Sequence, residues 1–107
     1  MYEVRFMRLL LFFDLPTTTQ KDKKAYAKFR KFLVNNGFLM IQFSVYARIC
    51  CGVESAQMYE KYVEDNLPKR GNVRSIIITN SQYERMKILL GTEKYEEKIG
   101  ERQLDLF

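Results

Sequence analysis

The stretch from Arg8 to Pro16 constrains the fold of this chain more than any other feature. Five apolar residues follow one another without a break at positions 9–13, between an arginine on one side and an Asp-Leu-Pro sequence on the other. An uninterrupted apolar run of this length, bounded by a charge and a proline, is typical of a strand buried on both faces. We therefore expect the central strand of a sheet, with Asp14 at the point where this strand leaves the core.

A helix is predicted over residues 20–36. Thr19 followed by Asp22 resembles a capping box in which Asp replaces the usual Glu, and Gly37 supplies a stop suited to the left-handed conformation. Apolar residues recur at intervals of three and four, which gives the helix one buried stripe. The stripe consists of Ala25, Phe29, Phe32 and Leu33.

The following residues predict three more strands and a second helix. Strands are expected near Leu39–Gln42 and Ser44–Cys50, with a bend around Phe43, then a helix near Ser55–Asn66 and a strand over Val73–Thr79. Three consecutive isoleucines suggest that this last strand is buried on both faces. The resulting order is βαββαβ, which indicates an α+β, ferredoxin-like fold with an antiparallel sheet and both helices on one face.

A short helical turn at Asn80–Met86 and a brief fifth strand at Lys87–Leu90 are predicted to complete a domain of residues 1–91. Residues 92–107 form a predicted C-terminal arm, which is charged until it closes with an apolar end. Such an end favours docking on a neighbouring molecule, although a frayed tail fits the pattern equally well. The docking residues would be Leu104, Leu106 and Phe107.

Composition excludes several classes of function. The chain has no histidine, which removes the usual general base and histidine metal ligands. The two cysteines, Cys50 and Cys51, are adjacent, so we expect one buried and one exposed reduced thiol rather than a metal site or a disulfide. No apolar run is long enough to span a membrane and no signal peptide is recognisable, which predicts a soluble protein of the cytoplasm. Phosphate-binding loops, dinucleotide fingerprints and zinc spacings are absent from the sequence.

Charge is distributed unevenly along the chain. Residues 1–92 hold fifteen Lys and Arg against eight Asp and Glu, whereas residues 93–107 hold three against five. A basic body favours a polyanionic partner, although a solvated basic surface is the simpler alternative. The first helix carries a row of lysines at intervals of three and four, and a basic turn follows the second helix. From this spacing the predicted nucleic-acid contacts are Lys21, Lys24, Lys28, Lys69 and Arg70.

Asp14 is the one candidate for catalysis and for metal binding. A single carboxylate holds Mg²⁺ poorly, because this ion is usually bound through one or two carboxylates with water and phosphate oxygens. In a symmetric homodimer, two copies of Asp14 near the two-fold axis could hold or flank Mg²⁺ beside a phosphodiester. Alternatively, Asp14 only accepts hydrogen bonds from the turn that follows it.

Several segments together resemble a known family, the second core CRISPR-associated protein, in the version that accompanies type II systems. The resemblance covers nearly the whole chain, in order and at the length typical of the family. It is carried by Met7–Pro16, Tyr26–Leu33, Gly37–Phe38, Gln42–Tyr46 and Gly71–Val73.

This resemblance implies a ferredoxin-like homodimer that bridges two dimers of the CRISPR integrase during spacer acquisition. Its basic surface would support the middle of a duplex DNA prespacer, and its C-terminal arm would contact the integrase. Several members of the family are described as metal-dependent nucleases whose aspartate at the end of the first strand binds Mg²⁺, and that position is Asp14 here.

Three functions therefore remain open on the sequence. The favoured one is a bridging subunit that binds duplex DNA, because a sequence-tolerant binder needs phosphate contacts and no base readout. The second is a Mg²⁺-dependent endonuclease acting on RNA or DNA through paired Asp14 residues. The third is a toxin-like ribonuclease or a small regulatory ferredoxin-like domain, in either case without an integrase partner.

Overall fold

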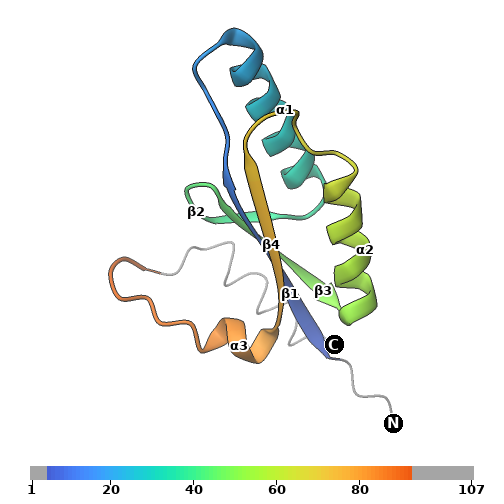
Figure 1. Cartoon of the computed structure of the whole chain (residues 1–107). Coiled ribbons are helices and arrows are strands. Elements are labelled where there is room, and N and C mark those ends of the chain that lie inside the picture. Colours follow the sequence, from blue (N-terminus) through green and yellow to red (C-terminus); the bar gives the residue numbers. More distant parts are fainter. Residues whose placement is uncertain (1–4, 93–107) are drawn as a thin grey trace.

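The fold is a four-stranded antiparallel sheet with two long helices on one face, as described by a computed structural model for residues 5–92 (Figure 1). The strands are β1 (Phe6–Asp14), β2 (Leu39–Gln42), β3 (Val45–Cys51) and β4 (Asn72–Thr79), and they lie in the order β2-β3-β1-β4. The helices are α1 (Gln20–Asn35), α2 (Val53–Glu64) and the short α3 (Asn80–Glu84). This arrangement confirms the predicted α+β, ferredoxin-like βαββαβ fold.

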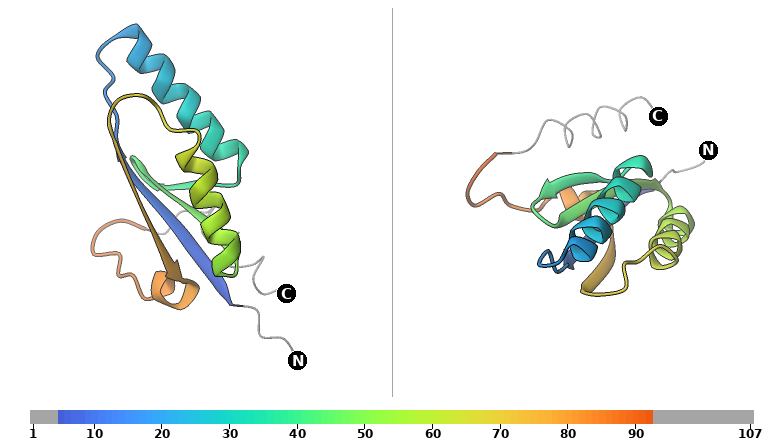
Figure 2. Two further views of the ribbon diagram at one scale, coloured as in Figure 1. Left: turned by 45° about the vertical axis from the view of Figure 1, so that its right-hand side comes forward. Right: turned by 90° about the horizontal axis from the view of Figure 1, so that it is seen from above.

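The central strand β1 was correctly predicted. Its side chains alternate between the two faces of the sheet, and each face carries its own cluster of buried side chains. Leu9 and Leu11 are fully buried against the helices, where Phe29, Leu33 and Val63 complete the main core. Figure 2 shows α1 and α2 side by side over this face. The opposite face of the sheet carries a smaller cluster around Leu10, Ile41, Ala47 and Tyr83.

The ends of α1 are fixed by the residues that predicted them. The hydroxyl of Thr19 accepts from the backbone N–H of Asp22 at 3.0 Å, and the Asp22 carboxylate accepts from the N–H of Thr19 at 3.3 Å, which completes the capping box. At the other end Gly37 adopts a φ of 83°, in the region that favours glycine. Of the predicted stripe, Phe29 and Leu33 are buried and the other two members are half-buried.

Two predictions for the segments after α2 are wrong. Lys87–Leu90 is not a strand, since no strand edge among the described residues pairs with it, and Leu89 and Leu90 are almost fully exposed. Strand β4 is not buried on both faces, because the long helices do not cover the face of the sheet on which Ile76 lies, and Ile76 is 49% exposed. The predicted helical turn is present but ends at Glu84, and α2 begins two residues earlier than expected, at Val53.

Arg48 links three elements from the helix-covered side of β3. Its Nε donates to the backbone carbonyl of Asn36 at 2.8 Å, its Nη1 donates to the carbonyl of Ile49 at 2.8 Å, and its guanidinium carbon lies 3.5 Å from the centre of the Tyr59 ring. A planar guanidinium can make all three contacts at once, whereas an ammonium cannot. The residue therefore ties the end of α1 to β3 and to α2.

We expect Arg48→Lys to lower the free energy of unfolding by about 1–3 kcal/mol, because hydrogen bonds from a charged donor and the contact with the ring are lost. Urea denaturation measures this change. Arg74→Lys is the matched control, because Arg74 is exposed on β4 and should tolerate the substitution within about 0.5 kcal/mol. Equal stability of the Arg48→Lys protein and the native protein would contradict this role.

Candidate nucleic-acid interface and strand-end carboxylate

Asp14 is the last residue of β1 and is exposed. It pairs with Asn72 at the start of β4, and its side chain lies on the face of the sheet opposite α1 and α2, as does that of Phe12 two residues earlier. The neighbouring strand β3 is reached through a hydrogen bond from the Phe13 N–H to the Ser44 carbonyl at 3.1 Å. Asp14 is thus held at a defined position on the rim of the sheet and is open to solvent.

Gly71 sets the close approach of the α2–β4 loop to this strand end. Its φ is 110°, and a Cβ atom added to it would lie 2.8 Å from the Asp14 carbonyl oxygen and 2.7 Å from Leu15 Cδ2. Only glycine fits both the backbone conformation and the space. The basic residues Lys69 and Arg70 are consequently held next to the end of β1.

The arrangement around Asp14 supplies one carboxylate for a divalent cation. Among residues 5–92 no group of three or more Asp, Glu, His or Cys side chains is close enough to hold a metal ion. The hydroxyl of Thr19, five residues after Asp14, is used to cap α1. Mg²⁺ accepts one protein carboxylate when water and phosphate oxygens complete its shell. Asp14 therefore fits as one ligand of such an ion.

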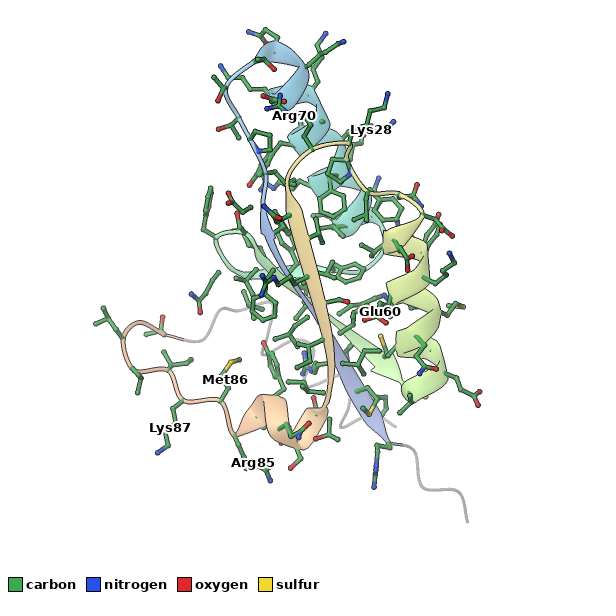
Figure 3. The ribbon with its side chains drawn as sticks, viewed as in Figure 1. Lys28, Glu60, Arg70, Arg85, Met86 and Lys87 are labelled. Carbon is green, nitrogen blue, oxygen red and sulfur yellow. The ribbon has the colours of Figure 1, made fainter. Side chains whose placement is uncertain are left out.

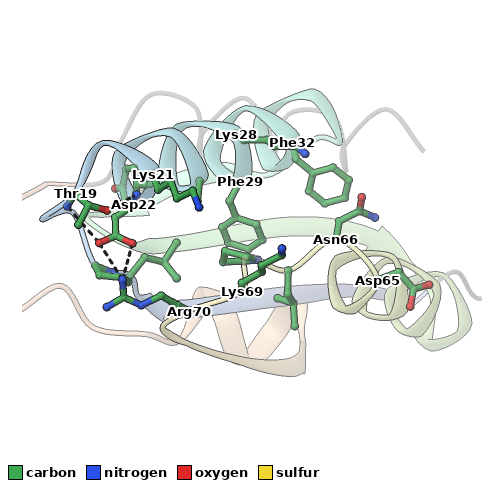
Figure 4. Close-up of a pocket in the computed structure, with 16 residues that line it drawn as sticks. Thr19, Lys21, Asp22, Lys28, Phe29, Phe32, Asp65, Asn66, Lys69 and Arg70 are labelled. Carbon is green, nitrogen blue, oxygen red and sulfur yellow. Dashed lines mark hydrogen bonds and ion pairs between the residues drawn. The ribbon is translucent and has the colours of Figure 1, made fainter.

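Four of the five predicted contact residues converge on one groove (Figure 4). Lys21 and Lys28 come from α1, and Lys69 and Arg70 come from the α2–β4 loop on the opposite wall. Lys24 is exposed on α1 but does not line the groove. The chain thus gathers cations from segments that are more than forty residues apart, and whether they contact nucleic acid stays a prediction.

Arg70 is oriented by Asp22 across the groove. Its Nη1 donates to Asp22 Oδ1 at 3.1 Å and to Oδ2 at 3.4 Å. The Asp22 carboxylate is buried, whereas the Arg70 side chain is 68% exposed. The pair joins the first turn of α1 to the α2–β4 loop and leaves the rest of the guanidinium facing solvent. The sequence identified Asp22 as a helix cap, but its partner 48 residues away could be found only from the fold.

The second acidic side chain of the groove is also paired. Lys61 Nζ lies 3.0 Å from Asp65 Oδ1, one helical turn away and in solvent. This hydrogen bond and the nearby carboxylates raise the pKa of Lys61. Both carboxylates that line the groove thus have a basic partner.

A buried arginine on the opposite face of the sheet was not anticipated. Arg8 is only 3% exposed; its Nε donates to Asn80 Oδ1 at 2.8 Å, and its guanidinium carbon lies 4.3 Å from the centre of the Tyr83 ring. These contacts fix α3 against β1. In the sequence, Arg8 directly precedes the apolar run and was interpreted only as the boundary of that run.

The cysteines behave as the alternation of a strand predicts. Cys50 is buried against the helices and Cys51 is exposed, and both are free thiols. Burial raises the pKa of the Cys50 thiol, and a hydrogen bond and the charge of Arg48 partly oppose this shift. Cys50 is therefore part of the core rather than a nucleophile.

Two further expectations concern the C-terminal arm and membrane spans. The docking residues Leu104, Leu106 and Phe107, and nearly all of the predicted C-terminal arm, lie outside the described residues. No helix in the described part of the chain is long and apolar enough to cross a membrane.

Comparison with known proteins identifies the family. The family model for "CRISPR associated protein Cas2" matches residues 7–86. A protein of Campylobacter jejuni named "CRISPR-associated endoribonuclease Cas2" is 47% identical over the whole of this chain and 76% of its own length.

Relatives with the same printed name extend this match. The protein of Ligilactobacillus salivarius is 52% identical over 79% of this chain and 84% of its own length. That of Acidovorax ebreus is 45% identical over 94% of this chain and its own full length. With a family match that spans both core helices and all four strands, this chain belongs to the Cas2 family.

Proposed function

We propose that this chain is the bridging subunit of a CRISPR adaptation complex, in which a homodimer lies between two integrase dimers and binds duplex prespacer DNA. The observation that carries this proposal is the convergence of Lys21, Lys28, Lys69 and Arg70 on one groove of a Cas2-family fold. Lys and Arg on fixed elements supply phosphate contacts without reading sequence, as a binder of varied prespacers requires. We place this activity in the cytoplasm, where the target DNA lies.

The exposed apolar residues on the helix-free face of the sheet support the homodimer. Phe12 and Ile76 lie on this face and are 42% and 49% exposed. Leu89 and Leu90 follow α3 and are more exposed still. Full burial of such a side chain from full exposure contributes about 1.5–3 kcal/mol, so covering the half-exposed Phe12 and Ile76 would contribute roughly half of that each. A second copy seated on this face would cover Phe12 and Ile76 and bring two copies of Asp14 into one assembly.

A second candidate is a metal-dependent endonuclease that uses paired Asp14 residues and Mg²⁺. The printed names of the relatives favour it, since they are called endoribonucleases. In this function the ion would polarise a phosphodiester and activate water. The protein's own contribution would be to hold the two carboxylates at the dimer axis and the phosphates at the basic groove.

Replacing Asp14 by Asn separates the two functions. In the bridging function, duplex affinity and assembly with the integrase should change by less than about 2-fold, because the residue is exposed and outside the groove lining. Any Mg²⁺-dependent cleavage of RNA or DNA should fall by about 100-fold or more, because a ligand of the ion is removed. Gel-shift and cleavage assays measure both effects.

The control is Asp65→Asn, which removes an exposed carboxylate of the groove and leaves the strand end intact. Loss of integrase assembly in the Asp14→Asn protein, but not in the control, would contradict a bridging role that is independent of the carboxylate.

A further inference from the structure

The groove between α1 and the α2–β4 loop has an apolar floor, which phosphate binding alone does not require. It is an open groove with a volume of about 850 Å³, within the range of sites that hold small ligands. Lysines stand at its rim, and its floor is apolar. A duplex backbone that touches only the rim would leave this floor unfilled.

The floor is built from aromatic and aliphatic side chains. Phe29 is buried at its base, and Tyr26 and Phe32 are half-buried beside it. Phe32 packs edge-on against Tyr62, with ring centres 5.1 Å apart, so its orientation is fixed before any ligand arrives. On the opposite wall Leu67 is 43% exposed. Side chains of this kind favour contact with an apolar part of a ligand.

The rim suits an anion. Asp22 is engaged by Arg70 and Asp65 by Lys61, so neither carboxylate opposes the three remaining lysines of the lining. Lys21 and Lys28 project from one wall and Lys69 from the other (Figure 4). A ligand that combines a flat ring with one or two negative charges matches both parts of the groove.

We propose that this groove binds an unpaired nucleotide, with its base against Phe32 and Leu67 and its phosphate at Lys28 and Lys69. Stacking of a base on an aromatic side chain is tolerant of sequence, because every base has a flat face. Leu15 and Pro16, which directly follow Asp14, line the other end of the groove, near Asp22 and Arg70. The inference deepens the proposed nucleic-acid binding and rests on it.

Fluorescence anisotropy with two labelled duplexes tests the inference. One duplex is blunt and the other carries the same base pairs with short unpaired thymidine or uridine ends, and both are measured in EDTA to prevent cleavage. The native protein should bind the duplex with unpaired ends about 5-fold to 50-fold more tightly than the blunt one. Phe32→Leu keeps an apolar side chain but removes the stacking face, and Leu67→Gln changes the opposite wall.

Both variants should lose the preference for unpaired ends and keep the affinity for the blunt duplex. Phe43→Leu is the matched control, because Phe43 is 82% exposed and does not line the groove. Equal binding of the two duplexes by the native protein would overturn the inference and leave duplex binding intact. Binding of neither duplex would instead overturn the proposed function.

Two further outcomes would also overturn the inference. A preference for unpaired ends that persists in both variants would place the nucleotide elsewhere on the protein. The second outcome uses a peptide with the acidic and apolar sequence of residues 101–107. If this peptide binds the native protein but not the Leu67→Gln protein, and the native protein shows no preference for unpaired ends, the groove is a peptide-binding site.

Discussion

Gly71→Ala is expected to lower the free energy of unfolding by about 2–5 kcal/mol, a large part of the 5–15 kcal/mol that stabilises a typical domain. Two costs combine in this substitution. An alanine must adopt a φ of 110°, which L residues rarely occupy, at about 1–3 kcal/mol. Its Cβ must also displace the backbone carbonyl of Asp14 and the side chain of Leu15, at a similar cost.

Gly52→Ala is the control that separates these two costs. Gly52 has a φ of 95°, but no atom lies within 4 Å of its added Cβ, so only the conformational cost applies. Urea denaturation should therefore show a smaller loss for Gly52→Ala than for Gly71→Ala. Equal losses would contradict the close packing of the α2–β4 loop against the end of β1.

Replacing Lys21, Lys28 and Lys69 together by Gln is expected to weaken duplex binding by about 10-fold to 100-fold near physiological salt. Each lysine that contacts a phosphate releases counterions, so the slope of log affinity against log salt should fall by about 1 for each contact removed. Anisotropy titrations over a range of salt concentrations measure both quantities. All three side chains are exposed, so the fold should persist.

The control changes the net charge by the same amount at the other end of the molecule. Arg5, Arg85 and Lys87 are exposed and do not line the groove, and Figure 3 shows Arg85 and Lys87 far from Lys28 and Arg70. Their replacement by Gln should reduce binding only slightly, through long-range attraction. Equal losses in the two triple variants would assign binding to net charge and not to the groove.

Local signals predicted most of the architecture. The apolar run at 9–13 identified the central strand, and the Thr19–Asp22 capping box and Gly37 placed both ends of α1, because each signal depends on neighbours within one or two turns. The isoleucines of β4 were misjudged because an apolar run does not show whether both faces of the sheet are covered, and Ile76 lies on the face without the long helices. The error at Lys87–Leu90 has the same origin, since strand pairing depends on an edge that the local sequence does not specify.

The candidate site was predictable in its chemistry and less so in its geometry. Spacing selected Lys21, Lys28, Lys69 and Arg70, and only the fold shows that α1 and the α2–β4 loop form opposite walls of one groove. The Asp22–Arg70 ion pair and the buried Arg8 escaped prediction because their partners lie 48 and 72 residues away. Long-range pairs of this kind follow from topology and not from local pattern.

The most direct test of the bridging function is the mass, by light scattering, of the complex formed by this chain, the integrase of its system and a short DNA duplex. The bridging function predicts one particle with two copies of this chain and two integrase dimers. It also predicts that this particle does not form when the chain ends at Gln103 and so lacks the predicted docking residues. Elution of the intact chain apart from the integrase, with and without duplex, would contradict the bridging function and leave the endonuclease as the better account.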